Sequence, residues 1–571
     1  MRRITLLIAV VLEVVACQRG RSAQQEKADL VIRDARIYTV ETQRPWAQAL
    51  AVKGDRIQWV GDNKDAGAYV GPATLVMDAG GHMLLPGFID SHFHVLLGGD
   101  PDVLRIQNGN TLGEIQRQVR EFADKHPDLK WIEVEGWNYS AFPHGTLPTA
   151  RDLEGLTGKR PAFLVAYDYH TIWMNREAMK EFGISRNTHE IVFAEKVEKD
   201  PNSGQPTGIL TGFGSTGLSE EAENELRKHL PSHAPDAIAR NITNNVAAAV
   251  RAGITTIVDP QSYLEDLDIY SRLRSQGKLP TRLQVALFHR RGTTDETLKQ
   301  FDHARQKYDD DWLRVSAVKL YIDDVIEPHT AALLEPYADR PGTRGQLDYP
   351  PDEFKQVVAR LDRMKFQVFI HSIGDRGIRT ALDAIEYAEK QNGPRDRRDE
   401  LIHIECLSKE DIPRFAQLGV IACMQPRHCA PDITGQWAKA VGPARWKYAW
   451  AFRSLHDAGA TLAFASDWNV AEMEPLVGIY TAMTRKGLDG KPDGGWVPEQ
   501  TIDLETAIRG YTINGAYANF LEQNRGSIVS GKYADLVMVS DDLFKVPIEK
   551  IKNVKVVWTM VGGKQVWNAA R

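Results

Sequence analysis

Eight short apolar segments recur along the middle of this 571-residue chain, and this recurrence limits its fold more than any other feature. Each segment is rich in apolar residues and is bounded by Gly, Asp or Pro, as buried strands are. From the second segment onward, helix-compatible stretches such as "DRGIRTALDAIEYAEKQ" lie between them. Strands that alternate with helices form a parallel sheet, and eight such units predict a TIM-like (β/α)8 barrel. The segments are "LLPGFID", "GITTIVDP", "RLQVALF", "VSAVKLYID", "FQVFIHS", "LIHIEC", "GVIACMQP" and "TLAFASDW".

One connection in this series is much longer than the others. Residues from 95 to about 250 separate the first and second predicted strands. This stretch contains strand-like runs of its own, "WIEVEGW" and "PAFLVAYDYH". We interpret it as an insertion on the barrel face that carries active sites, where it could cover the site.

Both ends of the chain have the composition of strands. "ADLVIRDARIYTV" opens the N-terminal end, and "GSIVSGKYADLVMVSDD" stands near the C-terminus. Two β-rich ends around a long α/β middle predict one small β-sandwich domain built from both termini. We expect residues 28–84 and 520–571 to form this domain, with the barrel and its insertion spanning 85–519.

The first residues have the pattern of an export signal. "MRR" precedes the apolar run "ITLLIAVVLEVVA", which is short for a membrane span. The run ends in "VVAC", which resembles a bacterial lipoprotein cleavage box, so residues 1–17 are predicted to be a signal peptide and Cys17 the lipidated residue. Residues 18–27 would then tether a periplasmic protein to the membrane, and the lipid would be its only membrane contact. The alternative is simple secretion after Ala16.

Net charge limits the possible binding partners, and cysteine content limits the possible disulfides. A net charge of -6 provides no basic surface for nucleic acid, so we expect a small-molecule substrate and no nucleic-acid partner. A homodimer is left open. Beyond Cys17 the chain has Cys406, Cys423 and Cys429, too few for a disulfide framework, so at least one is free or bound to something.

Polar residues gather where the predicted strands end, which is where barrel enzymes place their active sites. In "DSHFH", strand alternation sends both histidines to one face. The complete set is His92, His94, Lys319, His371, His403, Cys406 and Asp467.

Each of these residues also has an ordinary structural explanation. The two histidines could stand at a solvated edge, and His371 could be a hydrogen-bonded core residue. Lys319 could extend to solvent, and Asp467 could cap the next helix. The combination favours a site, because an unpaired buried lysine is costly. Imidazole and carboxylate groups bind zinc and similar divalent ions.

Longer motifs make the chain resemble the metal-dependent amidohydrolase superfamily, in the branch that includes N-substituted formamide deformylase. The resemblance extends from Ala28 to Val566. It rests on "LLPGFIDSHFH", "VKLYIDDVIEPHTAALLEPY", "HSIGDRGIRTALDAIE", "PRFAQLGVIACMQP", "DAGATLAFASDWNV" and "GSIVSGKYADLVMVS", and in the insertion on "DYHTIWMNREAM" and "GQPTGIL".

The resemblance implies a cofactor of one or two divalent ions, expected to be zinc. His92, His94 and Asp467 look like ligands of one ion. Lys319 looks like a bridging ligand carboxylated on its amine, and His371 looks like a ligand of the second ion. Relatives read Ile-Glu-His or Ile-Ala-His where this chain is matched at Ile404-Glu405-Cys406. This register implies that Cys406 binds metal and that His403 lies elsewhere.

The implied activity is hydrolysis of a non-peptide C–N bond in an amide, formamide or cyclic amide. Metal-activated hydroxide would attack the carbonyl, with Asp467 as general base and proton donor to the leaving group. Two departures from the family pattern motivate an alternative: Cys406 stands where relatives have histidine, and Asp324 stands where they have glycine. That alternative is a non-catalytic or single-metal binding lipoprotein. A deaminase or esterase on the same site is a further possibility.

Four residues of the insertion and one of a barrel loop are expected to face the substrate. Asp168, His170, Trp173 and Asn175 could close over the pocket from the insertion. His428 follows the seventh predicted strand and could reach the scissile carbonyl, although it could equally be a solvated loop residue.

Overall fold

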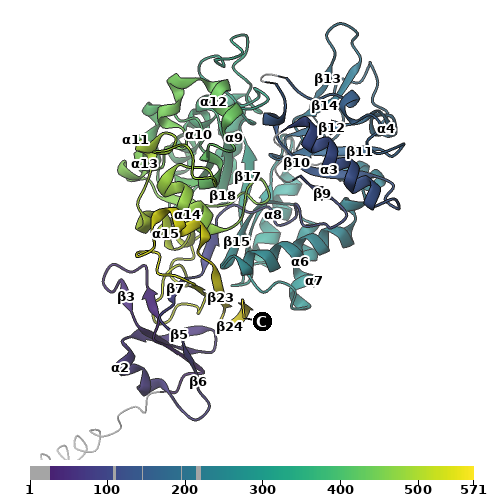
Figure 1. The fold of residues 1–571 in the computed structure, drawn as a ribbon. Coiled ribbons are helices and arrows are strands. Elements are labelled where there is room, and N and C mark those ends of the chain that lie inside the picture. The colour runs from purple at the N-terminus through teal and green to yellow at the C-terminus, as the bar shows by residue number, and fades with distance from the viewer. Residues whose placement is uncertain (1–25, 107–110, 144–145, 195, 214–219, 571) are drawn as a thin grey trace, which may run out of the picture.

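The computed structural model describes residues 26–570 except 107–110, 144–145, 195 and 214–219. The described chain has three parts: a β/α barrel, a second α/β layer inserted into it, and two small sheets made from the chain ends (Figure 1). The predicted signal peptide and most of the predicted tether lie outside the described residues. Within the described ranges, no helix is both long enough and apolar enough to cross a membrane.

The barrel consists of eight strands in chain order, as predicted, and hydrogen-bonded neighbours run parallel. The ends of the series meet where Ser91 N–H donates to Phe464 O at 3.2 Å and Phe93 bridges to Trp468. The (β/α)8 prediction is therefore confirmed. The strands are β8 (Phe88–Asp90), β15 (Ile254–Ser262), β16 (Arg282–Phe288), β17 (Leu313–Tyr321), β18 (Gln367–Ser372), β19 (Glu400–His403), β20 (Ile421–Met424) and β21 (Leu462–Phe464).

Helices cover the outside of this barrel because each has one apolar face. In α10 (Asp375–Asn392), Ile378, Ala381, Leu382 and Ile385 are fully buried, and their spacing places them on one side of the helix. The other long helices of the barrel layer are α6 (Pro235–Arg251), α7 (Asp266–Ser275), α8 (Asp295–Lys307), α9 (Pro351–Arg363) and α14 (Pro475–Thr484). Shorter ones are α11 (Ile412–Leu418), α12 (Gly435–Val441), α13 (Phe452–Asp457), α15 (Leu504–Gly510) and α16 (Ile513–Ala518).

The insertion between β8 and β15 has its own six-stranded sheet in the order β13-β14-β12-β11-β10-β9. Helix α3 (Leu112–Lys125) packs on it through Ile115, Val119 and Phe122. The loop between β11 and β12 carries residues 167–170 to the barrel. The remaining elements are β9 (Leu104–Arg105), β10 (Ile132–Trp137), β11 (Ala162–Ala166), β12 (Thr171–Met174), β13 (Lys196–Lys199), β14 (Pro206–Thr211), α4 (Arg176–Glu181) and α5 (Glu220–His229).

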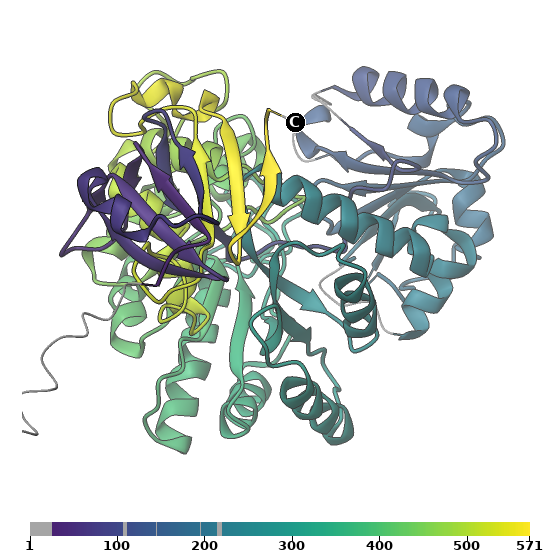
Figure 2. The ribbon, with the colours of Figure 1, turned by 90° about the horizontal axis from the view of Figure 1, so that it is seen from below.

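Strands of the N-terminal end alone form a four-stranded sheet, and strands of both chain ends together form a six-stranded sheet. β22 pairs antiparallel with β7, which ties the C-terminal strands to the N-terminal ones. Figure 2 shows the purple N-terminal strands beside the yellow C-terminal ones. The sheets are β5-β4-β1-β6 and β24-β23-β22-β7-β2-β3. Their strands are β1 (Leu30–Arg33), β2 (Arg36–Tyr38), β3 (Trp46–Ala47), β4 (Ala49–Lys53), β5 (Arg56–Gly61), β6 (Leu75–Asp78), β7 (Met83–Pro86), β22 (Leu536–Val539), β23 (Val556–Val561) and β24 (Lys564–Asn568).

Candidate metal centre

The first barrel strand delivers two histidines to its carboxyl end. Beyond the end of β8, strand alternation sends His92 and His94 to the same side, and their rings lie 5.1 Å apart. Asp467, which follows β21, lies against both: its Oδ1 is 3.3 Å from His92 Nε2 and 3.3 Å from His94 Nε2. The Asp467 backbone is held there because its N–H donates to His92 O at 2.8 Å.

Two more histidines from the opposite wall complete the cluster. His371 lies in β18 and His403 is the last residue of β19, with their ring centres 4.6 Å apart. The His403 ring lies 5.3 Å from that of His92. One ligand atom from each of His92, His403 and Asp467 lies within 4.8 Å of the others. Four imidazoles and a carboxylate therefore meet at one end of the barrel.

Burial keeps three of these imidazoles neutral. Burial lowers the pKa of His92 to about 3, and the nearby Lys319 acts in the same direction. Burial likewise holds the pKa of His371 and His403 well below the usual range. The His403 ring is oriented by Gln425, whose Oε1 lies 2.9 Å from its Nδ1. Neutral, oriented imidazole is the form that binds a metal ion.

Lys319 is completely buried in the barrel wall between these groups. Its Nζ has no hydrogen-bond partner among the described residues and lies 4.8 Å from the ring centre of Tyr321. Burial lowers the pKa of Lys319 to about 8, although Asp467 and other carboxylates oppose this shift. A buried amine without a partner is costly to keep for packing alone.

The atoms left without partners test whether the cluster fits a metal ion. Buried polar groups are almost always hydrogen-bonded in native proteins. Here several buried ligand-type atoms in one place have no hydrogen-bond partner in the described part of the chain. They are both ring nitrogens of His92, Nδ1 of His371, Nζ of Lys319 and Oδ1 of Asp467. Neutral nitrogens and carboxylate oxygens in this arrangement fit a zinc-like divalent ion.

Cys406 lies outside this cluster, so the position predicted for its thiol is wrong. Strand β19 ends at His403, where φ is +75°, and Ile404 follows with φ of +52°. These left-handed conformations turn the chain away from the barrel, and strand alternation does not continue to Cys406. Its N–H donates to Ile373 O at 3.0 Å, and its side chain is buried in the hydrophobic core. Burial raises the pKa of the Cys406 thiol well above the usual range, which disfavours the thiolate that binds metals.

Two of the residues expected to face the substrate also lie elsewhere. Trp173 in β12 packs against Trp137, with ring centres 5.9 Å apart, and donates from Nε1 to Thr149 O at 2.8 Å. It therefore belongs to the core of the insertion. Asn175 caps α4, since its Oδ1 accepts from Ala178 N–H at 2.9 Å. Neither residue lines the cavity.

The other three residues expected to face the substrate do line the cavity. Asp168 and His170 lie in the loop between β11 and β12, and His428 follows β20. The His170 Nδ1 makes an ion pair with Asp324. Burial opposes this charge, but Asp324 raises the pKa of His170 to about 9. The His428 Nε2 lies 3.7 Å from Asp467 Oδ2.

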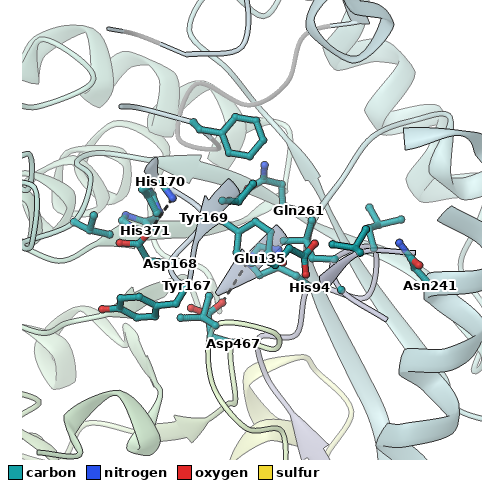
Figure 3. A pocket seen from close by; sticks show the side chains of 18 of the residues that line it. His94, Glu135, Tyr167, Asp168, Tyr169, His170, Asn241, Gln261, His371 and Asp467 are labelled. Carbon is teal, nitrogen blue, oxygen red and sulfur yellow. Dashed lines mark hydrogen bonds and ion pairs between the residues drawn. The ribbon is translucent and has the colours of Figure 1, made fainter. Parts of the chain in front are cut away.

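A cavity of about 220 Å³ lies between the barrel mouth and the insertion, over the histidine and aspartate cluster. In Figure 3, Asp168, His170 and His371 lie together on one side of it, with Asp467 below and His94 on the other side. The barrel contributes His94, Gln261, Tyr321, Glu327, His371, His403, Glu405, His428 and Asp467; the insertion contributes Glu133, Glu135, Phe163, Tyr167, Asp168, Tyr169, His170 and Phe213.

Sequence reasoning missed most of the residues that line this cavity and placed His403 away from it. Glu327, Glu405 and Tyr167 line its wall, and none was singled out. The signal for Glu405 was present, because a carboxylate two residues beyond a strand-end histidine is well placed to reach the same opening. His403 was placed away from the metal, although a strand-end histidine was the simpler candidate.

The fold and the site define a class: a barrel hydrolase that depends on metal. The amidohydrolase family model matches residues 75–567, and the chain belongs to this family. It is 30% identical to protein LONG AFTER FAR-RED 3 of Arabidopsis thaliana, over 95% of this chain and 92% of that one. It is 25% identical to N-substituted formamide deformylase of Arthrobacter pascens, over 94% and 97%. An uncharacterized metal-dependent hydrolase from Pyrococcus horikoshii shares the fold, with a TM-score of 0.70 and 20% identity over 91% and 99% of the two chains.

Proposed function

We propose that this chain hydrolyses an amide, formamide or cyclic amide bond that is not a peptide bond. The observation that carries the proposal is the buried cluster at the barrel mouth, in which neutral imidazoles, an amine and a carboxylate converge and several of their ligand-type atoms have no hydrogen-bond partner among the described residues. The cluster opens into a cavity large enough for a small molecule. The name of the Arthrobacter relative supports a formamide as one substrate to test first.

We assign the metal ligands from the geometry rather than from the register of the family motif. The proposed ligands are His92, His94, Lys319, His371, His403 and Asp467, which replaces Cys406 by His403. Zinc is proposed because nitrogen ligands dominate the set. When bound, the ion supplies a more acidic water molecule and polarises the substrate carbonyl.

Lys319 becomes a useful ligand only after its amine is changed. Burial lowers its pKa to about 8, so a substantial share of the amine is neutral near physiological pH. A neutral amine can add carbon dioxide, forming an N–C bond and releasing one proton, which leaves a carboxylate on the side chain. This reaction converts a buried cation into an anionic ligand and removes the cost of burying an unpaired ammonium group.

Asp467 is the proposed proton carrier of the reaction. Burial alone would raise its pKa, but His92 and His94 beside it hold the pKa well below the usual range, so the carboxylate is ionised and ready to accept a proton. It can then pass this proton to the departing nitrogen, which must be protonated to leave. His428 Nε2, buried and without a hydrogen-bond partner in the described chain, lies near Asp467 and can donate to the substrate carbonyl oxygen.

The reasons for proposing a non-catalytic binding protein are weaker once the geometry is known. Cys406 does not replace a ligand, because His403 stands at the metal cluster. Asp324 forms an ion pair with His170, and His170 lines the cavity. Neither residue indicates a decayed site.

The decisive test combines metal analysis with a substrate panel. We expect the purified protein to contain at least one divalent ion per chain and to release amine from some member of a panel of formamides, N-acyl amines and cyclic amides. Detection of ammonia or alcohol instead would indicate a deaminase or an esterase. His92→Ala should lose metal and activity, whereas His303→Ala, an exposed histidine on α8, should change neither. A metal-free protein inactive on the whole panel after incubation with zinc or manganese would contradict the proposal.

We also propose that the enzyme is exported to the periplasm and anchored to the membrane by a lipid on Cys17. The support is the sequence pattern alone, because residues 1–25 lie outside the described structure. Labelling with a radioactive fatty acid would test it: wild-type chain should carry label and Cys17→Ser should not.

The homodimer stays a prediction, which sedimentation of the purified protein would test.

A further inference from the structure

The wall of the cavity beyond Asp467 carries two carboxylates that the proposed reaction does not use. Glu405 follows β19, and Glu327 follows β17. His428 connects them to the reaction centre: its Nδ1 lies 3.8 Å from Glu405 Oε1, and its Nε2 lies 3.7 Å from Asp467 Oδ2. The Glu405 carboxylate is therefore about one imidazole ring away from the proton carrier, within the reach of a small substrate.

Glu405 is buried without a strong partner. The residue is 7% exposed, and the contact of its carboxylate is the long one with His428 Nδ1, at 3.8 Å from Oε1. Asp168, on the same cavity wall, is 9% exposed, and its Oδ2 has no hydrogen-bond partner among the described residues. Such groups are costly in a folded protein unless a ligand completes them.

The negative charge of this wall is not balanced by the protein. Within the described part of the chain, no lysine or arginine side chain forms an ion pair with Glu327 or Glu405. The nearby protonated His170 is already paired with Asp324. Two carboxylates on one cavity wall, one of them buried and neither paired with a lysine or arginine of the described chain, favour a cation between or beside them.

An aromatic ring stands at the same place. The Tyr167 hydroxyl donates to Glu327 Oε1 at 3.0 Å, and the Tyr167 ring lies 6.0 Å from that of Tyr139. Tyr139 in turn donates to Asp168 Oδ1 at 3.2 Å. These contacts hold the carboxylates and the rings in fixed positions. Carboxylates combined with aromatic rings are suited to an ammonium or guanidinium group.

We propose that Glu405 and Glu327 bind a positively charged group of the substrate, so that the natural substrates are small amides carrying an ammonium or guanidinium group a few bonds from the scissile bond. This inference rests on the proposed function and specifies the substrate class. The cation would lie against Glu405, Glu327 and Tyr167, while the carbonyl group would lie by Asp467 and His428.

The test compares two substrates that differ only in charge. One is the monoformamide of a linear diamine; the other is the formamide of the alkylamine in which a methyl group replaces the ammonium group. For the metal-loaded wild-type enzyme, kcat/KM should be about tenfold to a hundredfold higher for the cationic formamide, as expected for hydrogen bonds to charged groups. Glu405→Gln and Glu327→Gln keep the shape of the side chain, and each should reduce this preference by about tenfold.

A matched control is Glu353→Gln. It removes the charge of a carboxylate on α9 that pairs with Arg291 at the surface, and it should leave the preference unchanged. The inference would be overturned if the wild-type enzyme treats both formamides alike. It would equally be overturned if both cavity variants lose activity on the two substrates in the same proportion, as a purely structural role requires. Failure to hydrolyse any amide with metal present would instead contradict the proposed function.

Discussion

His403 shows how the backbone of a single residue decides which side chain reaches the candidate metal centre. It ends β19 with φ of +75°, and Ile404 continues with a second positive φ. Non-glycine residues rarely adopt this conformation, and here two in succession end the strand pattern. Three residues later Cys406 faces the hydrophobic core.

This geometry predicts opposite outcomes for two substitutions. His403→Ala should lower bound metal and reduce kcat/KM at least a hundredfold, since outer partners of ligands alone often cost tenfold to a hundredfold. Cys406→Ala should retain metal and most activity. Metal content is measured by plasma mass spectrometry on proteins purified in the same way. If Cys406→Ala loses metal and His403→Ala retains it, Cys406 is the ligand, as the register of the family motif implies.

Lys319 gives a second prediction for a single residue. If carboxylation makes it a ligand, zinc binding by metal-free wild-type protein should strengthen with added bicarbonate. Lys319→Met keeps an apolar stem but has no amine, so it should bind zinc more weakly and show no bicarbonate effect. Titration with a fluorescent zinc indicator, with and without bicarbonate, measures both. An equal bicarbonate response in the two proteins would contradict carboxylation at this position.

Sequence reasoning reached some site residues and not others for physical reasons. His92, His94, Lys319 and Asp467 could be placed because each lies within or directly after a strand whose apolar pattern is clear. His403 and Cys406 could not, since two positive φ values carry no signature in non-glycine residues. The neighbours of Glu405 come from three separate segments, and no pattern within one segment predicts that convergence.

At the scale of elements, Asn175 couples a strand of the insertion to a helix. Its Oδ1 accepts from Ala178 N–H in α4 and from Ala162 N–H at the start of β11, both at 2.9 Å. Its Nδ2 donates to Arg160 O at 2.9 Å. The motif match in "DYHTIWMNREAM" therefore reflects structure at this position. One buried amide holds the strand that positions the loop with Asp168 and His170.

Asn175→Ala should destabilise the protein by about 2–3 kcal/mol, because it removes a cap and leaves a buried N–H unpaired. The matched control is Thr111→Ala, which removes the exposed cap of α3 and should cost about 1 kcal/mol or less. Differential scanning calorimetry under identical conditions compares the two proteins. Equal small shifts in Tm would mean that the buried hydrogen bonds of Asn175 contribute little.

At the scale of the whole molecule, the two terminal sheets are attached to the barrel far from the metal centre. Arg282, the first residue of β16, donates from Nε to Asp535 Oδ2 at 2.7 Å and from Nη2 to Oδ1 at 3.1 Å. Both side chains are almost completely buried, and Asp535 also accepts from Gly562 N–H at 2.7 Å. Since active sites occupy the other end of the strands, this contact is structural.

Asp535→Asn therefore separates stability from catalysis. Removing one charge leaves Arg282 buried and unpaired, which should cost about 3–5 kcal/mol and lower Tm by several degrees. The exposed pair of Arg291 and Glu353 is the control, because Glu353→Gln should change stability by less than about 1 kcal/mol. KM and metal content of the folded Asp535→Asn protein should stay near the wild-type values, measured well below its Tm. A large change in KM without a change in Tm would show that the terminal sheets act on the cavity through the barrel, and would contradict a purely structural role for this contact.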